Sequence, residues 1–288
     1  DAIKRIFNTY VEYQDKVDVF YVAFSGGKDS VVVLDLVKRA LPHTAFLVVF
    51  GDTMMENQET YSLVNTMEAA CEQEGIKFYR AKSRMLPEES WSLFGPPAVT
   101  IRWCCSVHKT APQIRLLREV LGKHDFRGMA FTGVRSDEST ARSEYTEINF
   151  GRKHNGQYSS HPIIEWNAAE LFLYTYSRKL HLNDSYRKGN SRVGCLICPM
   201  SSGKHEYMKY QSNPIASDSL LAIIKETSAK QSFTDVEMRS FIDVGNWKKR
   251  RTGRELSFPP DRYYVDTRKG DGYIHVSSIN DNWKEWVK

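Results

Sequence analysis

The stretch Ser25-Gly26-Gly27-Lys28-Asp29-Ser30 decides the fold that we expect for this chain. The apolar run 17–24 before it is typical of a buried strand, and the apolar positions in 31–37 after it predict a helix. Glycines allow a tight turn between the two. Because such a turn directs backbone N–H groups and the positive end of a helix at one point, we predict that it binds a phosphate or pyrophosphate, with Lys28 adding charge. The alternative is an ordinary tight turn with a serine cap, and the stretch does not match the Walker A pattern.

The chain around this stretch alternates strands with helices. We expect strands at 44–50, 76–81 and 128–132, and helices at 1–16, 57–74, 111–121 and 168–180. This alternation predicts an α/β fold with a doubly wound, mostly parallel sheet flanked by helices. Residues 83–103 and 151–160 are rich in breakers or polar residues, and we expect both to be loops.

The C-terminal third has a different pattern. Candidate helices at 220–224 and 235–242 are followed by a small hairpin or extension from residue 273. We therefore expect two parts: a nucleotide-binding domain over residues 1–205 and a helical, basic extension over residues 206–288.

Composition and charge limit the class of protein. The 288 residues carry 40 Lys and Arg against 35 Asp and Glu, a net charge of +5 that is compatible with nucleotide or nucleic-acid binding. No apolar run approaches the roughly 20 residues that cross a bilayer, and no secretory pattern opens the chain. We expect a cytoplasmic protein without a membrane segment. Because the chain does not start with Met, we also expect it to be a processed or excised piece of a longer protein.

Polar side chains follow two further strands. Asp52 comes after the second strand, and Arg135 and Arg142 come after the strand at 128–132. Ligands of such sheets bind at the carboxyl ends of the strands, so Asp52, with Glu56, could face a nucleotide or Mg²⁺. A guanidinium binds phosphate or sulfate through two hydrogen bonds. The alternatives are a turn-capping aspartate and a solvated basic loop.

Four of the five cysteines form two tight pairs: Cys104 with Cys105, and Cys195 with Cys198. An odd number of cysteines without an export signal favours reduced thiols or metal ligands over disulfides. Four thiols suit either Zn²⁺ or a [4Fe–4S] cluster. Adjacent cysteines place both sulfurs on one small zinc ion only with strain, so we favour the cluster. Zinc and inert buried thiols remain alternatives, and we expect Cys71 to be a core residue.

Several of these elements resemble one known family. Residues 25–30 resemble the pyrophosphate loop of the adenine nucleotide α-hydrolases. The reductases of phosphoadenylyl sulfate (PAPS) and adenylyl sulfate (APS) carry an element similar to residues 133–142, and the paired cysteines resemble the cluster motif of the APS reductases. The resemblance implies a nucleotide site made by Ser25, Gly26, Gly27, Lys28, Asp29, Ser30, Gly133, Arg135, Glu138 and Ser139. It also implies a [4Fe–4S] cluster on Cys104, Cys105, Cys195 and Cys198.

The resemblance leaves the reaction open. Reductases of this family use a cysteine of a C-terminal tail as nucleophile, and no cysteine follows Cys198 here. We therefore predict an ATP pyrophosphatase or adenylyl-transfer step with Mg²⁺. Its catalytic residues would be Lys28, Asp29, Asp52, Arg135 and Arg142. The alternatives are an APS or PAPS reductase that releases sulfite, and a non-catalytic accessory subunit of a defence complex.

Further partners follow from the same resemblance and from one basic run. Proteins of this pattern act in sulfur insertion, including DNA phosphorothioation and tRNA thiolation, which implies a sulfur donor protein. Lys248–Arg254 is the densest basic run, and the aromatic residues near it make a nucleic-acid contact an open alternative to a solvated face.

Overall fold

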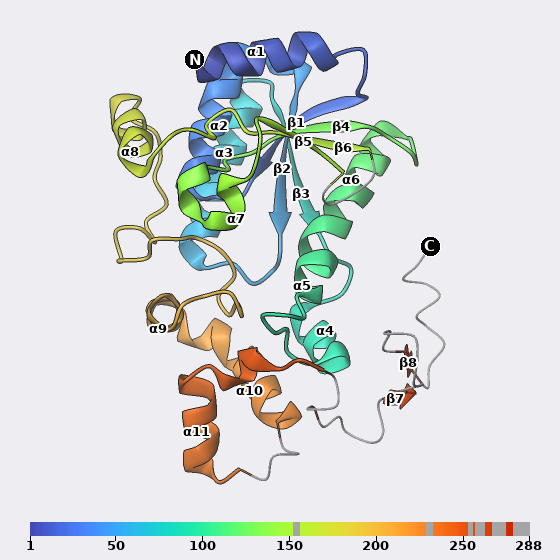
Figure 1. Cartoon of the computed structure of the whole chain (residues 1–288), viewed down its shortest axis with the longest axis vertical. Coiled ribbons are helices and arrows are strands. Elements are labelled where there is room, and N and C mark those ends of the chain that lie inside the picture. Colours follow the sequence, from blue (N-terminus) through green and yellow to red (C-terminus); the bar gives the residue numbers. More distant parts are fainter. Residues whose placement is uncertain (152–155, 229–232, 253–255, 257–262, 267–274, 279–288) are drawn as a thin grey trace. The chain divides into compact units, whose positions relative to one another are not determined.

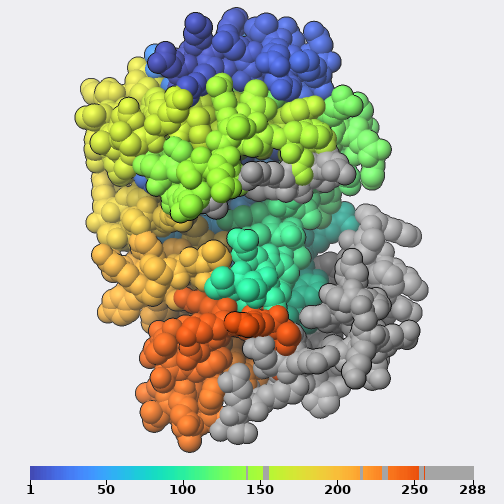
Figure 2. Space-filling view, viewed as in Figure 1, coloured from blue at the N-terminus to red at the C-terminus, as the bar shows by residue number. Residues whose placement is uncertain are grey.

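The computed structural model describes residues 1–151, 156–228, 233–252, 256, 263–266 and 275–278 (Figure 1, Figure 2). It divides into two compact units. The first unit comprises residues 1–82 and 107–195, and the second comprises residues 83–106 and 196–288. A separate domain over residues 206–288 stays a proposal, since the second unit also includes residues 83–106.

The first unit is built on a six-stranded sheet with helices on both sides (Figure 1). Its strands are β1 Val19–Phe24, β2 Leu47–Asp52, β3 Lys77–Lys82, β4 Gly128–Phe131, β5 Ile148–Phe150 and β6 Gln157–Ser160. Their order across the sheet is β3-β2-β1-β4-β6-β5. Among these strands, β5 and β6 pair antiparallel and all other neighbours pair parallel. The expected doubly wound, mostly parallel α/β fold is confirmed.

Both faces of this sheet are covered by helices. The helices of the first unit are α1 Ala2–Tyr13, α2 Lys28–Ala40, α3 Gln58–Gln73, α6 Ala111–Leu121, α7 Thr140–Ser143 and α8 Ala168–Ser177. Successive residues of a strand point to opposite faces. Phe20 and Val22 of β1 therefore pack with the side chains of α1, α2 and α3. Tyr21 faces the other way and packs with Ile114 and Leu117 of α6.

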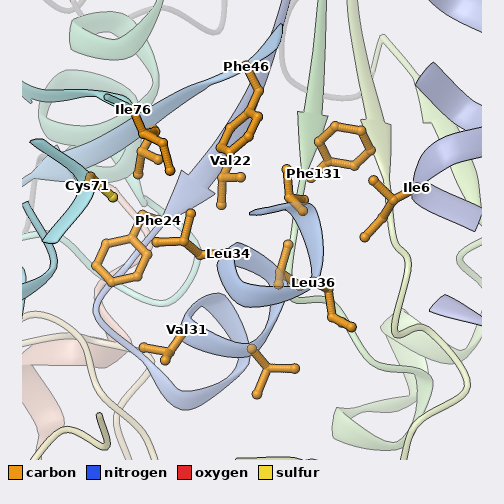
Figure 3. Close-up of a cluster of buried hydrophobic side chains, with 14 of the residues drawn as sticks. Ile6, Val22, Phe24, Val31, Leu34, Leu36, Phe46, Cys71, Ile76 and Phe131 are labelled. Atoms are coloured by element: carbon orange, nitrogen blue, oxygen red, sulfur yellow. The ribbon is translucent and has the colours of Figure 1, made fainter. Parts of the chain in front are cut away.

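The larger of the two cores contains the predicted core cysteine (Figure 3). Cys71 of α3 is 1% exposed and lies among apolar side chains that include Val64 and Ile76. Burial raises the pKa of its thiol to about 11, because the thiolate is poorly solvated there. The prediction of a core residue is confirmed, and this thiol is protonated near neutral pH.

Two segments that we expected to be loops contain regular structure. Residues 83–103 include α4, Pro87–Phe94, which starts with a proline at the first helical position and has acidic residues in its first turn. The polar stretch 151–160 contains β6, which pairs with β4. Three of its four residues are only partly buried, so polar side chains are tolerated and the strand lacks an apolar pattern. Both loop predictions were wrong at these residues.

The second unit is mainly helical, as expected for the C-terminal part. Besides α4 it contains α5 Trp103–Cys105, α9 Gly203–Ser212, α10 Pro214–Thr227, α11 Asp235–Asp243, a 3₁₀ turn Asn246–Lys249 and the strands β7 Tyr263–Asp266 and β8 His275–Ser278. The two strands form an antiparallel pair. The hairpin or extension was expected from residue 273 onward, so β8 lies in the expected segment but its partner β7 lies before it; residues 273–274 and 279–286 lie outside the described residues. In the part of the chain that is described, no helix combines the length and apolar character needed to cross a membrane.

Two cations of the basic run in the second unit are buried. Lys248 is 8% exposed and forms an ion pair with Glu206. Arg250 is 6% exposed and donates to the carbonyl oxygen of Pro96 at 2.5 Å. Neither cation is therefore available for a nucleic-acid contact, and the exposed cations of the described run are Lys249 and Arg251. Residues 253–254 lie outside the described residues.

Candidate nucleotide-binding site

The predicted loop joins β1 to α2 and is held in one shape by its own side chains. Gly26 has a φ of +71°, and a Cβ at this position would lie 2.8 Å from Cγ2 of Thr60, so glycine is required here. The Ser30 hydroxyl donates to the carbonyl oxygen of Gly27 at 2.8 Å and accepts from the N–H of Ser25 at 3.2 Å. The loop thus presents the first turn of α2, where backbone N–H groups lack intrahelical partners.

Lys28 lies at the start of this helix against a tyrosine distant in the sequence. Its backbone N–H donates to the hydroxyl of Tyr186 at 3.0 Å, and its Nζ lies 5.3 Å from the centroid of the Tyr186 ring. The same Nζ lies 3.1 Å from the Asp29 carboxylate. Burial is the main reason why the pKa of Tyr186 is raised, so this hydroxyl stays neutral and can also donate.

The loop after β4 packs directly on the start of α2. A Cβ on Gly133 would lie 2.7 Å from the backbone carbon of Asp29, which shows how close the two segments are. Arg135 is 4% exposed, and its Nε donates to Oδ1 of Asp29 at 2.7 Å. Nη1 of Arg135 donates to Oδ1 of Asp137 at 2.6 Å and to the carbonyl oxygen of Trp166 at 3.3 Å. Arg135 therefore connects the two loops and does not line the pocket between them.

A pocket of about 280 Å³ lies between these loops. Its lining residues come from β1 and the first loop, from the loop after β4 and from a later segment: Ala23, Ser25, Gly27, Lys28, Asp29, Ser30, Gly133, Val134, Glu138, Arg142, Tyr186, Arg192 and Val193. Arg142 forms an ion pair with Glu138, whose side chain is 11% exposed. Arg192 donates to the backbone carbonyl of Glu138 at 3.3 Å. Burial and then the neighbouring Arg192 lower the pKa of the Arg142 guanidinium.

The structure brings together most of the residues that the sequence suggested for the nucleotide. Ser25, Gly27, Lys28, Asp29, Ser30, Gly133, Glu138 and Arg142 line the pocket. Gly26 allows the turn of the loop against Thr60, and Arg135 holds the loop through its hydrogen bond to Asp29. Ser139 is exposed at the start of α7 and is not among the lining residues.

Asp52 lies at the end of β2, next to β1, but outside this pocket. Its Oδ1 accepts from the N–H of Met54 and the hydroxyl of Tyr61, both at 2.9 Å. Lys82 approaches Oδ2 at 3.4 Å. Both oxygens thus have partners, so this arrangement gives Asp52 little capacity to bind Mg²⁺. The role of Asp52 stays a prediction.

The neighbouring Glu56 is different. It is 6% exposed, and its Oε2 is buried with no hydrogen-bond partner among the described residues. Its Oε1 accepts from the Thr53 hydroxyl at 2.9 Å, lies 3.8 Å from Sγ of Cys195 and forms an ion pair with Nζ of Lys109 at 3.7 Å. A buried carboxylate oxygen without a donor, such as this Oε2, suits a hard cation such as Mg²⁺, although Glu56 is not among the residues that line the pocket.

The four paired cysteines are distributed over both units. Cys195 ends the first unit, and Cys104, Cys105 and Cys198 belong to the second. None of the five cysteines forms a disulfide, and these four are all at least partly exposed, unlike Cys71. Within the described part of the chain, no three side chains of the His, Cys, Asp and Glu types gather into a metal-binding group. The thiols have the right chemistry for such a cluster, and the cluster stays a prediction.

Tyr186, Arg192 and Asn183 are the site residues that the sequence analysis missed. The side chain of Asn183 donates to the carbonyl oxygen of Gly26 at 3.0 Å and to Thr60 at 3.1 Å, which fixes the segment on the loop. No periodic pattern marks this segment. The available signal was the position of Arg192 in the sequence, two residues before Gly194 and three before Cys195 of the paired cysteines.

Residues 20–201 match the family model of the phosphoadenosine phosphosulfate reductase domain. The chain belongs to this family. The match covers more than half of the 288 residues and includes the loop, the residues 133–142 and all four paired cysteines. The resemblance inferred from the sequence is therefore confirmed, and with it the adenine nucleotide α-hydrolase fold.

Relatives with and without a named activity are similar over most of the chain. An uncharacterised protein of Methanocaldococcus jannaschii is 33% identical over 210 residues, which are 73% of this chain and 42% of that protein. The adenosine 5'-phosphosulfate reductase of Halalkalibacterium halodurans is 27% identical over 221 residues, 74% of this chain and 86% of that enzyme. The chain thus spans less than half of the first relative and most of the second. The prediction that this is an enzyme of the superfamily is confirmed at the family level.

Among solved structures, the PAPS reductase of Candida auris in a phosphate complex is 21% identical with a TM-score of 0.48. The match covers 67% of this chain and 93% of that enzyme. An FMN adenylyltransferase of Candida glabrata with an ATP analogue is 14% identical with a TM-score of 0.49, covering 68% of this chain and 61% of that one.

Proposed function

We propose that this chain binds an adenine nucleotide in the pocket and breaks or transfers at its α–β phosphate linkage, as an ATP pyrophosphatase or adenylyl-transfer enzyme. The observation that carries the proposal is the lining of the pocket. It combines the first turn of α2 with Lys28 and Arg142, and none of its lining residues is a cysteine. This is a site for a polyanion without a thiolate nucleophile.

Each residue of the site has a role in this proposal. The oxygen of water, or of an adenylyl acceptor, attacks the α-phosphorus and loses its proton to solvent. The bond from the α-phosphorus to the bridging oxygen breaks, and pyrophosphate leaves with the negative charge. Lys28, the N–H groups of the loop and Arg142 stabilise that charge. Asp29 and Arg135 position the loop, because they connect α2 to the loop after β4. Mg²⁺ would arrive with ATP, and Glu56 is the residue whose carboxylate best suits it.

Product analysis tests the proposal. We expect the anaerobically prepared protein to convert ATP to AMP and pyrophosphate in the presence of Mg²⁺, as measured by chromatography of the nucleotides. Replacing Lys28 by Met should lower the rate by about 100-fold or more, since it removes charge stabilisation of the leaving group. The matched control is Lys123→Met, an exposed lysine that pairs with Asp18 away from the pocket. Release of ADP and phosphate alone would contradict the proposal.

The second candidate function is an APS or PAPS reductase, and the named activity of the Halalkalibacterium relative favours it. It predicts sulfite release from APS or PAPS with a thiol donor. Cys71 does not suit the nucleophile's role, because it is buried and its pKa is raised to about 11. If sulfite is released and Cys71→Ser abolishes it, the reductase function replaces the first proposal. Nucleotide binding without any product would instead favour an accessory subunit.

We propose further that the paired cysteines hold a [4Fe–4S] cluster, with zinc as the alternative. When bound, the cluster would supply structural support or sulfur handling. Anaerobically purified protein is then expected to be brown and to contain about four irons per chain. The double variant Cys195→Ser/Cys198→Ser should lose this iron, whereas the control Cys71→Ser should keep it. Stoichiometric zinc without iron would contradict the cluster.

The wider role that we propose is sulfur metabolism, including sulfur insertion into nucleic acid of the phosphorothioation type. A sulfur donor protein and a nucleic acid would then be partners. Lys249 and Arg251 are the exposed cations of the described basic run that could contact a nucleic acid. Salt-sensitive DNA or RNA binding that Lys249→Ala/Arg251→Ala weakens would support this role.

A further inference from the structure

The charges that line the pocket do not balance. Its charged lining residues are Lys28, Asp29, Glu138, Arg142 and Arg192. Lys28 pairs with Asp29 at 3.1 Å, and Arg142 pairs with Glu138. The remaining cation, Arg192, has no carboxylate partner in the described part of the chain and contacts a backbone carbonyl. The pocket therefore carries one positive charge in excess, on an exposed side chain at its edge.

The position of this charge matters more than its sign. The side chain of Arg192 is held by the Glu138 carbonyl, close enough to Arg142 to disfavour the charge on that guanidinium. Two guanidiniums that repel each other across a pocket are stabilised when an oxyanion binds between them. The start of α2 and Lys28 form a separate anion-binding group in the same pocket. The pocket thus has places for two linked anionic groups.

We propose that Arg192 is a specificity-determining residue that binds the second of two linked anionic groups of the ligand, of the pyrophosphate or phosphosulfate class. This rests on the proposed nucleotide-binding function and deepens it. The first group lies on the start of α2, and the second lies between Arg142 and Arg192. A ligand with one phosphate leaves Arg192 without a partner and binds more weakly.

Binding of two simple probes tests this assignment. Calorimetric titration of the whole chain with pyrophosphate and with inorganic phosphate is compared for the unmodified protein, Arg192→Gln and Arg187→Gln. Arg187 is the matched control, because it lies in the same segment, is 76% exposed and pairs with Asp184 outside this pocket. We expect Arg192→Gln to lower pyrophosphate affinity by about tenfold, from the loss of charged hydrogen bonds. Phosphate affinity should change less than about twofold, and Arg187→Gln should change neither.

A lysine at this position sharpens the test. Arg192→Lys keeps the charge but not the planar fork, so we expect it to restore only part of the pyrophosphate affinity. Equal losses for both probes, no loss on Arg192→Gln, or no measurable pyrophosphate binding to the unmodified protein would each overturn the assignment. The outcome does not depend on which reaction the protein catalyses. If the protein cleaves ATP and Arg192→Gln binds pyrophosphate as tightly as the unmodified protein does, only this inference is refuted. Arg192-dependent pyrophosphate binding without AMP release refutes only the proposed reaction.

Discussion

Replacing Arg135 by Ala is expected to lower the free energy of unfolding by about 1.5–3 kcal/mol, the usual cost of losing a buried hydrogen bond to a charged group, because Asp29 keeps Lys28 as a partner. The Arg135 side chain is 5% exposed and that of Asp29 is 16% exposed. Without Arg135, the Asp29 carboxylate loses its 2.7 Å partner, and the Trp166 carbonyl loses a donor. Nucleotide binding should be lost as well, because the start of α2 is no longer tied to the loop after β4.

Urea unfolding measures this effect. The midpoint of the transition should move to a lower urea concentration, while the slope of the unfolding free energy against urea concentration stays the same. The control is Arg187→Ala, since that arginine is exposed and forms a surface pair with Asp184, which is worth at most about 1 kcal/mol. A double variant, Asp29→Asn/Arg135→Gln, removes both charges and should be less destabilised than Arg135→Ala. Equal stability of Arg135→Ala and Arg187→Ala would show that the buried pair does not support the site.

Replacing Gly133 by Ala should weaken nucleotide binding strongly, by a mechanism that involves no charge. The new Cβ would lie 2.7 Å from the backbone carbon of Asp29 and 2.9 Å from its oxygen. Because these are backbone atoms, the first turn of α2 has to move away from the end of β4. Overpacking of this kind costs about 1–3 kcal/mol of stability. The larger effect falls on the ligand, since the loop, Lys28 and Arg142 no longer face the same point.

Titration with ATP, together with thermal unfolding, separates the two effects. We expect ATP affinity to fall by about tenfold or more, while the fold is retained at room temperature. Gly203→Ala is a suitable control, because a Cβ there meets nothing within 4 Å. ATP binding by Gly133→Ala at the level of the unmodified protein would show that the contact between Gly133 and Asp29 does not shape the site.

Residues near one another along the chain account for the parts of the fold that could be predicted. The helix α6, Ala111–Leu121, was predicted with its observed bounds, and α3 and β1 within a few residues. Their apolar spacing reflects burial on one face or on both. The strand β6 was missed, because its side chains are only partly buried and its sequence is polar. Its pairing with β4 comes from the sheet and not from its own composition.

The distinction between local patterns and tertiary contacts applies to the site as well. The loop 25–30 and the element 133–142 are short motifs, so they were found from the sequence. That Arg135 binds Asp29 and only Arg142 reaches the pocket could not be predicted, since both arginines sit in one polar turn. Lys248 and Arg250 of the basic run are buried, although the dense positive charge of the run predicted exposed side chains.

The sequence alone determined that a glycine-rich turn joins the first strand to a helix, because glycines, flanking hydroxyls and apolar periodicity are local properties. It also determined the family, through several motifs in a fixed order. The tertiary structure decided which side chains complete the pocket. Tyr186 and Arg192 lie more than 150 residues after the loop that they face. Such contacts depend on how the whole sheet and its connections pack, and no local pattern encodes them.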